Sequence, residues 1–329
     1  MKVVVIDSFG GPEVLRVADR PAPEPGAREV LVRVAAAGVN RADLLQRRGH
    51  YPAPPGVAAD VPGLEFAGVV DATGDGVTRW RVGDRVMGLL GGGAYAELVV
   101  AHEDEIVRVP EGMALVDAGA VPEAFITAHD ALFTRLGVRA RERVLIHAVG
   151  SGVGTAALQL ALAAGARVIG TSRTADKLER ARCLGLDAGI HGGAHWPDDV
   201  MEATGTAGVD AIVDLVGAAY FDGNLRVLAP LGRIVLVGTP SGVKAELDLG
   251  RVMRTRATIV GTVLRARAHA EKVDATRAFE RDVMPLLASG RVRPIVDRVF
   301  PLARAADAHR YVEANASFGK VVLTTGFGG

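Results

Sequence analysis

A glycine-rich turn between an expected buried strand and an expected helix limits the possible folds of this chain more than any other feature. Residues 144–161 read VLIHAVGSGVGTAALQLA, with glycine at positions 150, 152 and 154. Glycines in this place let the backbone turn tightly and approach a pyrophosphate, whose charge is then stabilised by free N–H groups at the helix start. The strict G-x-G-x-x-G spacing fails at Thr155, so an ordinary tight turn without a ligand remains the alternative. In this setting the turn predicts a dinucleotide site.

The part of the chain after about residue 123 alternates between strand-like and helix-like stretches. Short apolar runs are separated by amphipathic stretches such as Val153–Ala164 and Ala175–Leu184. Alternation at this spacing predicts an α/β domain with a doubly wound parallel sheet and right-handed crossovers. The candidate strands are Val144–Ala148, Arg167–Thr171, Ala211–Leu215, Arg233–Gly238 and Thr258–Leu264, with a short one at Ala188–His191.

The first 120 residues and the last 65 do not show this regular alternation of strand-like and helix-like stretches. Strand-like runs such as Val30–Ala35, Glu65–Val70 and Tyr95–Val100 are separated by Gly and Pro clusters, which indicates a β-rich domain. The tail is too long to be one more unit of the parallel sheet, so we expect it to complete this first domain. Its expected elements are a helix at Ala268–Ala288, a strand at Ile295–Phe300, a helix at Ala303–Asn315 and a strand at Lys320–Thr324. The predicted division is therefore 1–122 with 265–329, and 123–264.

The end of the second strand of the parallel sheet indicates which dinucleotide is bound. A site for NAD places an Asp or Glu there, about 20 residues after the glycine turn, to hold the ribose 2′-hydroxyl. This chain instead has Ser172 and Arg173, with Lys177 four residues later. These side chains suit a 2′-phosphate, through charge-assisted hydrogen bonds, and so predict NADPH. The alternative is that Arg173 and Lys177 belong to a solvated helix start.

Composition excludes several other classes of protein. Lys plus Arg and Asp plus Glu both number 38, so a general electrostatic hold on nucleic acid or anionic lipid is not expected. The single cysteine, Cys183, excludes intramolecular disulfides and multi-cysteine zinc sites, and we expect it on the inward side of a helix. The start, MKVVVID, does not read as a signal peptide, and no apolar run is long enough to span a bilayer. The expectation is a soluble, cytoplasmic protein without a membrane partner.

Several motifs together resemble the zinc-free quinone oxidoreductases of the medium-chain dehydrogenase/reductase superfamily, in the branch that is similar to zeta-crystallin and closest to the stress-inducible quinone oxidoreductases. The motifs are VNRADLLQRRGHYPAP (39–54), PGLEFAG (62–68), GDRVMGL (83–89), GGGAYAELV (91–99), VPEAFITAHDALF (121–133), the glycine turn and FGKVVL (318–323). They span nearly the whole chain. The resemblance implies a GroES-like β-rich catalytic domain and a Rossmann domain, with NADPH in the cleft between them.

The resemblance also implies roles for individual residues. Asn40, Asp43 and Tyr51 match polar positions that line the nicotinamide and substrate cleft, and we treat them as catalytic candidates. Thr127 matches a residue near the nicotinamide. The other implied cofactor contacts are Gly150, Ser151, Gly152 and Val153 at the pyrophosphate, Ser172, Arg173 and Lys177 at the 2′-phosphate, and Gly238, Leu264 and Lys320 elsewhere.

Two departures from related proteins are informative. Zinc-dependent members place a cysteine near Asn40 and Arg41, and a histidine where this chain has Leu64, so the ligands of a catalytic zinc are missing. Relatives often place a tyrosine after the third strand to help hold the adenosine phosphate. This chain has His191 and Gly192 there, which leaves either a weaker NADPH preference or support from His191.

The expected chemistry is reduction of a quinone by NADPH, which requires positioning more than polarisation by a metal. Tyr51 is the candidate to orient a carbonyl oxygen, since a phenol with a pKa of about 10 is a proton donor at neutral pH. A loop tyrosine packed on nearby prolines is the alternative for Tyr51, and a turn and cap role is the alternative for Asn40 and Asp43. The alternative functions are reduction of a conjugated C=C bond in an enoyl thioester or enal, and a non-catalytic RNA-binding or structural role.

Three further interpretations concern residues outside these motifs. His147, inside the first strand of the parallel sheet, is expected to be a satisfied core or cleft residue. The basic side chains of residues 254–267, Arg265 among them, are expected to reach a cofactor phosphate or to form an exposed face. The resemblance also implies a homodimer or homotetramer, because relatives pair their Rossmann sheets through the sixth strand. Here that strand is Thr258–Leu264, whose β-branched, apolar residues suit a sheet edge that needs covering.

Overall fold

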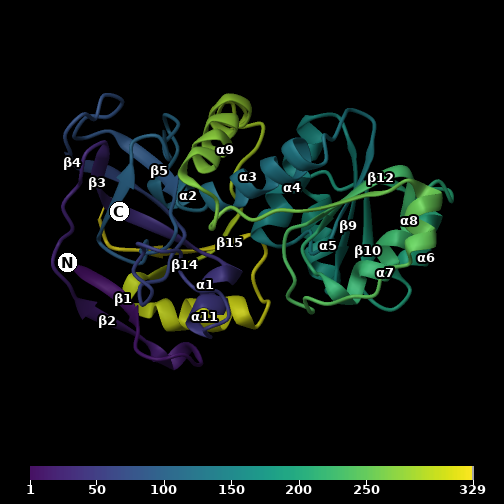
Figure 1. The fold of residues 1–329 in the computed structure, drawn as a ribbon, viewed down its shortest axis with the longest axis horizontal. Coiled ribbons are helices and arrows are strands. Elements are labelled where there is room, and N and C mark those ends of the chain that lie inside the picture. Colours follow the sequence, from purple (N-terminus) through teal and green to yellow (C-terminus); the bar gives the residue numbers. More distant parts are fainter. Residues whose placement is uncertain (328–329) are drawn as a thin grey trace. The chain divides into compact units, whose positions relative to one another are not determined.

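The computed structural model describes residues 1–327 and divides the chain into two compact units (Figure 1). Unit 1 comprises Met1–Ile126 and the chain from Leu264 onward, and unit 2 is the continuous stretch Thr127–Val263. The predicted breaks, after residues 122 and 264, lie close to these. The helix α3 (Pro122–His129) contains the first junction.

Unit 2 is a parallel six-stranded sheet with helices between successive strands, which confirms the predicted doubly wound α/β fold. The strand order is β10-β9-β8-β11-β12-β13. The strands are β8 (Arg143–Ile146), β9 (Arg167–Ser172), β10 (Ala188–His191), β11 (Val209–Asp214), β12 (Leu228–Leu236) and β13 (Thr258–Gly261). The helices are α4 (Gly152–Ala163), α5 (Ala175–Arg182), α6 (Trp196–Ala203), α7 (Ala218–Val227) and α8 (Leu249–Thr255), and Asp130–Arg135 is a π-helix.

The fifth and sixth strands of this sheet end earlier than predicted. β12 ends at Leu236, because the N–H groups of Val237 and Gly238 turn to the carbonyl of Asp214 at the end of β11. β13 ends at Gly261. The apolar pattern continues beyond both ends, which is why the sequence alone extends them.

Unit 1 is built around a seven-stranded sheet, with the order β14-β15-β3-β4-β5-β7 and β6 paired with β3. β15 lies between β14, to which it is parallel, and β3, to which it is antiparallel. The strands are β3 (Glu29–Val39), β4 (Glu65–Thr73), β5 (Arg85–Leu89), β6 (Leu98–His102), β7 (Ile106–Arg108), β14 (Val296–Pro301) and β15 (Lys320–Thr324), and β1 (Lys2–Ile6) and β2 (Leu15–Asp19) form a separate hairpin. The helices are α1 (Arg41–Arg47), α2 (Leu115–Ala118), α9 (His269–Asp282), α10 (Met284–Ala288) and α11 (Ala305–Glu313), with 3₁₀ turns at Pro12–Val14 and Leu302–Arg304.

Two local predictions need correction. The single helix expected over 268–288 is two helices, α9 and α10, because Pro285 near the start of α10 cannot donate to the preceding turn. Cys183 is exposed and not inward, since α5 ends at Arg182 and the buried side chains of that helix are Leu178 and Ala181. Among residues 1–327, no helix is long and apolar enough to cross a membrane.

Candidate functional site

The glycine turn leads directly from β8 into α4. Ser151 caps the helix, and its Oγ accepts a hydrogen bond from the Gly154 N–H at 3.0 Å. A Cβ on Gly154 would lie 2.4 Å from the carbonyl oxygen of Ala148, so only glycine lets the helix start pack this closely on the turn. The first-turn N–H groups of a helix need external acceptors. The turn therefore has the shape and polarity that a pyrophosphate requires, with Gly154 as its third glycine.

The predicted 2′-phosphate residues lie at the end of the neighbouring strand. Ser172 is the last residue of β9, Arg173 is exposed, and Lys177 is partly exposed in the first turn of α5. Ser172 Oγ accepts a hydrogen bond from the Thr174 N–H at 3.3 Å. Gly238 follows β12, so Ser172, Arg173 and Gly238 lie at the carboxyl ends of parallel strands, where such sheets bind ligands.

One buried hydroxyl on α3 lacks a partner. Thr127 is 7% exposed, and its Oγ1 makes no hydrogen bond to any residue between 1 and 327. Buried hydroxyl groups without a partner are rare because their desolvation is costly. A polar group of a bound dinucleotide would supply the missing partner, so this atom fits the predicted cofactor, as the glycine turn does.

His147 lies in a fully paired polar network at the end of β8, which confirms the prediction of a satisfied core histidine. Its Nδ1 is 2.9 Å from Thr171 Oγ1, and its Nε2 is 2.6 Å from Asn224 Oδ1. Asn224 Nδ2 donates to Asp214 Oδ2 at 2.8 Å, and the other Asp214 oxygen accepts the N–H groups of residues 216 and 217. Because the Asn224 Oδ1 only accepts, Nε2 carries the proton of His147. Burial lowers the pKa of His147, so the ring is neutral.

Replacing Asn224 with leucine is expected to reduce the free energy of unfolding by about 3 kcal/mol, because the His147 N–H and an Asp214 oxygen would both be buried without partners. Urea denaturation followed by circular dichroism would measure the loss. Leucine at the exposed Asp222 of the same helix is the matched control and should cost less than about 0.5 kcal/mol. Equal losses in the two variants would contradict the proposed importance of the network.

In unit 1, the Glu65 carboxylate accepts hydrogen bonds from residues of three other elements: β15, the start of α1 and α3. Its Oε1 accepts from Lys320 Nζ at 2.6 Å and from Asn40 Nδ2 at 2.8 Å, and its Oε2 accepts from the Glu123 N–H at 2.8 Å. Lys320 Nζ also donates to the Asn40 Oδ1 and to the Val39 carbonyl. The Glu65 side chain is 0% exposed and that of Lys320 5%, so this is a buried ion pair. All three ammonium N–H bonds of Lys320 are thus used inside unit 1, and its role as a cofactor contact stays a prediction.

Asp43 is fully buried and holds the loop around α1. One oxygen accepts from the Gly63 N–H at 3.0 Å, and the other accepts from the Asn40 N–H at 2.8 Å and from the Tyr95 hydroxyl at 3.2 Å. Burial raises the pKa of Asp43 to about 6, although the two backbone N–H groups oppose this. These contacts fit the cap and turn role, and a catalytic role for Asp43 stays a prediction.

A directional hydrogen-bond chain continues from Asp43 through the core of unit 1. Arg47, which is 0% exposed, lies 3.3 Å from His309 Nδ1, and the other ring nitrogen of His309 lies 3.1 Å from the Tyr95 hydroxyl. Arginine only donates, so His309 Nε2 carries the proton and donates to Tyr95, whose hydroxyl then donates to Asp43. Burial and the charge of Arg47 lower the pKa of His309 to about 3, which keeps the ring neutral.

Tyr51 lies against a buried arginine that the sequence did not single out as a site residue. The guanidinium carbon of Arg265 is 4.9 Å from the Tyr51 ring centre, a cation–π contact. Arg265 donates to the Tyr51 carbonyl at 3.0 Å, the Gly91 carbonyl at 2.6 Å and Gln46 Oε1 at 2.6 Å. The expectation that Arg265 reaches a phosphate or forms an exposed face is wrong, because it is 4% exposed and protein acceptors occupy its donors.

Glu123, in the first turn of α3, is the acidic residue with the most unusual surroundings. Burial and the neighbouring Glu65 carboxylate raise the pKa of Glu123 to about 8. Burial and the Glu123 charge also raise the pKa of Tyr51, so both groups keep their protons at neutral pH. In the sequence Glu123 is only one residue of the 121–133 motif, because the charged groups that surround it come from four other segments of the chain.

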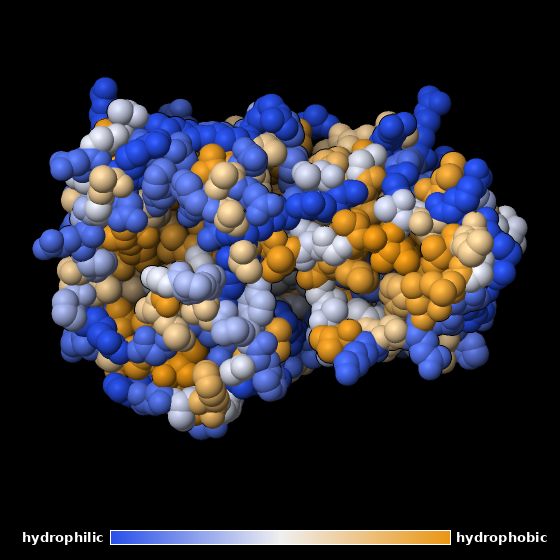
Figure 2. Space-filling model, viewed as in Figure 1, coloured by the Kyte–Doolittle hydropathy of each residue, from blue (hydrophilic) through white to orange (hydrophobic). Residues whose placement is uncertain are grey.

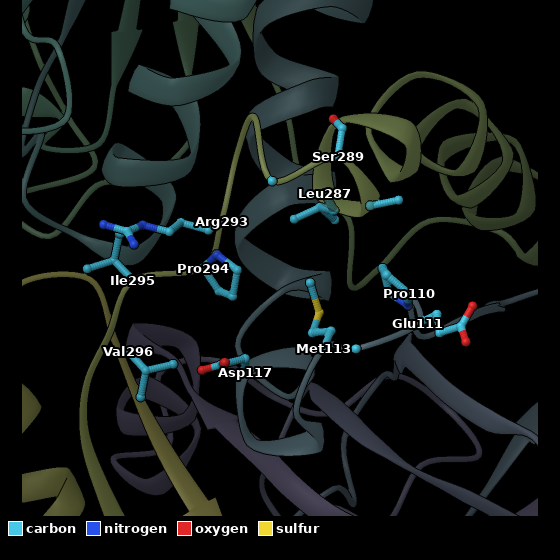
Figure 3. A pocket seen from close by; sticks show the side chains of 13 residues that line it. Pro110, Glu111, Met113, Asp117, Leu287, Ser289, Arg293, Pro294, Ile295 and Val296 are labelled. Atoms are coloured by element: carbon cyan, nitrogen blue, oxygen red, sulfur yellow. The ribbon is translucent and has the colours of Figure 1, made fainter.

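A separate cavity of about 690 Å³ lies in unit 1 (Figure 3). None of the predicted site residues lines it. Its walls are Pro110–Met113, Asp117, Leu287–Gly290 and Arg293–Val296. Leu264, another predicted cofactor contact, is buried beside Arg265 in the sequence and is likewise outside this cavity. No group of three or more His, Cys, Asp or Glu side chains in residues 1–327 is arranged to hold a metal.

Comparison with known proteins identifies the family. The alcohol dehydrogenase GroES-like domain model matches residues 26–111, and the zinc-binding dehydrogenase model matches residues 152–281. A quinone oxidoreductase of Pseudomonas aeruginosa is 35% identical over 324 residues, which cover 98% of this chain and 99% of the relative. The chain belongs to the quinone oxidoreductases of the medium-chain dehydrogenase/reductase superfamily. The resemblance inferred from the sequence motifs is thereby confirmed, as are the GroES-like and Rossmann folds.

Solved structures agree with this family over nearly the whole chain. An NAD-dependent alcohol dehydrogenase is 37% identical, with a TM-score of 0.89 and coverage of 99% of this chain and 100% of that one. A mycobacterial protein in complex with NADPH is 32% identical, with a TM-score of 0.89 and coverage of 98% and 100%. The enoyl reductase CurK is 28% identical, with a TM-score of 0.87 and coverage of 98% of each chain.

Proposed function

We propose that this chain is a quinone reductase that uses NADPH and needs no catalytic metal. The observation that carries the proposal is the end of β9, where Ser172 and Arg173 replace the carboxylate of an NAD site, one strand away from the glycine turn that starts α4. Family membership supports the same reaction. NADPH supplies the hydride when it is bound, and one proton completes the conversion of a quinone to a hydroquinone.

The residues of unit 2 hold the cofactor in this proposal. Ser151, Gly152 and Val153 present the first turn of α4 to the pyrophosphate, and Thr127 offers its unpaired hydroxyl to a polar group of the dinucleotide. Ser172 and Arg173 take the 2′-phosphate, together with Lys177 in the first turn of α5.

The residues of unit 1 supply polar groups and protons. Tyr51 is a phenol held by Arg265, and its raised pKa keeps it a hydrogen-bond donor that can orient a quinone oxygen. Glu123 holds a proton on its carboxyl at neutral pH. Asn40, Lys320 and Glu65 fix the loop that precedes α1, at the place where zinc-dependent relatives carry a ligand.

The test is oxidation of NADPH and NADH by metal-free protein, with ortho-quinones, para-quinones and a 2-enoyl thioester in parallel. Fast turnover of NADPH with a quinone, unchanged by a chelator, is the expected result. Turnover only after a metal is added, or only with NADH, would contradict the proposal.

Reduction of a conjugated C=C bond is the second candidate, favoured by the full-length structural match to the enoyl reductase CurK. This reaction needs a proton delivered to carbon, whereas a quinone takes its proton on oxygen. Tyr51→Phe should therefore abolish turnover of an enoyl thioester, but not of a quinone, if the enoyl reaction is the physiological one.

We further propose that the chain forms a homodimer through the β13 edge of unit 2. β13 has no strand on its outer side within residues 1–327, and α8, which packs on the neighbouring strand β12, has no fully buried side chain. Leu249 and Met253 of that helix are 66% and 77% exposed, and Figure 2 shows hydrophobic residues gathered on the face that carries α8. An apolar face and an open strand edge favour a second copy as the cover. Light scattering that gave a monomer at micromolar concentration would contradict this.

A further inference from the structure

The carboxyl ends of β9 and β10 in unit 2 are joined by hydrogen bonds. The role inferred here for these bonds rests on the proposed use of NADPH. β10 runs parallel to β9 with His191 opposite Ser172. The Gly192 N–H donates to the Ser172 carbonyl at 2.8 Å. The ring nitrogen His191 Nε2 lies 3.1 Å from the Arg173 carbonyl and donates to it, since a carbonyl oxygen only accepts. His191, the last residue of β10, and Gly192, which follows it, thus hold the two residues that would face a 2′-phosphate.

Tyr220, in the first turn of α7, fixes the position of His191 and Gly192. Its hydroxyl donates to the Gly192 carbonyl at 2.8 Å. Its ring is stacked on Trp196, with centres 5.1 Å apart, and meets the His147 ring edge-on at 4.9 Å. Because His147 is buried and fully paired, these ring contacts determine where the phenol lies. The phenol in turn determines where Gly192 lies.

The contact between Tyr220 and Gly192 requires glycine at position 192. A Cβ added there would lie 2.4 Å from the Tyr220 hydroxyl oxygen, closer than atoms can approach. The φ of Gly192 is not in the left-handed region, so the constraint comes from this one oxygen and not from the backbone. Glycine at 192 and tyrosine at 220 are therefore a matched pair.

We propose that Tyr220 is a positioning residue for the 2′-phosphate of NADPH, acting through Gly192 and His191 on the turn that carries Ser172 and Arg173. A 2′-phosphate is recognised by hydrogen-bond donors at fixed positions. The hydrogen bonds from His191 and Gly192 keep the backbone of Ser172 and Arg173, and so their donors, in place. NADH lacks this phosphate, so its binding does not depend on the turn. Tyr220 thereby acts on the choice between the two dinucleotides and not on the chemistry of hydride transfer.

The experiment measures the dissociation constants of NADPH and NADH by titration calorimetry, with thermal unfolding to establish that each variant is folded. Tyr220→Phe should raise the Kd for NADPH by about 3- to 10-fold, the effect of one hydrogen bond, and that for NADH by less than 2-fold. Gly192→Ala should weaken NADPH more than 10-fold. The double variant Gly192→Ala/Tyr220→Phe should return to the level of Tyr220→Phe alone, because phenylalanine lacks the oxygen that the new methyl group would meet.

Tyr311→Phe is the matched control, since it removes a 2.8 Å tyrosine hydrogen bond to Asp297 in unit 1. It should leave both dissociation constants unchanged. A wild-type protein that prefers NADPH while Tyr220→Phe and Gly192→Ala keep the same NADPH to NADH ratio would overturn this inference and leave the proposed function intact. A double variant as weak as Gly192→Ala would also overturn it. A wild-type protein without preference for NADPH would overturn the proposed cofactor itself.

Discussion

Replacing Lys320 with methionine is expected to reduce the free energy of unfolding by about 3–5 kcal/mol, the range for breaking a buried ion pair from one side. Methionine fills a similar volume but removes the ammonium, which leaves the Glu65 carboxylate buried with only amide donors. The loss would be measured by urea denaturation at neutral pH. The double variant Lys320→Met/Glu65→Gln should recover a large part of the loss, because the uncompensated charge is then gone.

The exposed ion pair between Lys2 and Asp19 provides the control for this experiment. Its side chains are 54% and 73% exposed, and pairs of this kind contribute little because water screens them. Lys2→Met should therefore cost less than about 0.5 kcal/mol. If Lys320→Met is as mild as Lys2→Met, the carboxylate of Glu65 is not a charged member of a buried pair.

Glu123→Gln is expected to remove most of the loss of stability that the wild-type protein suffers between pH 5 and pH 9. An unfolded glutamate has a pKa of about 4.5, whereas the folded protein keeps the Glu123 proton to about pH 8. As the pH rises through this window the unfolded state releases the proton first, so stability present below pH 4.5 declines until about pH 8. The difference in unfolding free energy between wild type and variant should change by about 4 kcal/mol between pH 5 and pH 9, measured by urea denaturation at both pH values.

The charged groups around Glu123 give this prediction its direction. Burial and Glu65 raise its pKa, with a smaller contribution from Asp43, while Lys320 and Arg265 lower it. Glutamine keeps the shape and the neutral charge of the protonated acid. Glu111→Gln, at an exposed position of the same unit, should leave the dependence on pH as in the wild type. Equal slopes for Glu123→Gln and the wild type would show that Glu123 is ionised in the folded protein.

The parts of the site that the sequence predicts are those made by neighbouring residues. The turn from Gly150 to Gly154 combines a strand, three glycines and a helix within a short stretch, and Ser172 lies one strand later. In a parallel sheet, the carboxyl ends of all strands lie at the same edge, so residues that follow successive strands in the sequence are close in space. Order along the chain is therefore enough to place these residues together.

The polar interior of unit 1 could not be predicted in the same way. The hydrogen bond between Tyr95 and His309 joins residues 214 positions apart, and that between Arg47 and His309 joins residues 262 apart. No periodic pattern marks such partners. In the sequence, Arg265 is one of several basic residues of a stretch expected to be exposed or to reach a phosphate. Its burial depends on acceptors from residues 46, 51 and 91, which are distant in the sequence.

The place of β15 in the sheet of unit 1 has a consequence for how the protein is made. Unit 2 is one continuous stretch, so a chain emerging from the ribosome can complete that sheet early. β15 pairs with β3, and Lys320 reaches Glu65 across 255 positions of sequence. Until this strand emerges, residues Ala36–Val39 of β3 lack a partner on one side and Glu65 has no counter-ion. Between the emergence of unit 2 and that of β15, nascent chains therefore carry a folded unit 2 and an incomplete unit 1 that is vulnerable to proteases and to aggregation.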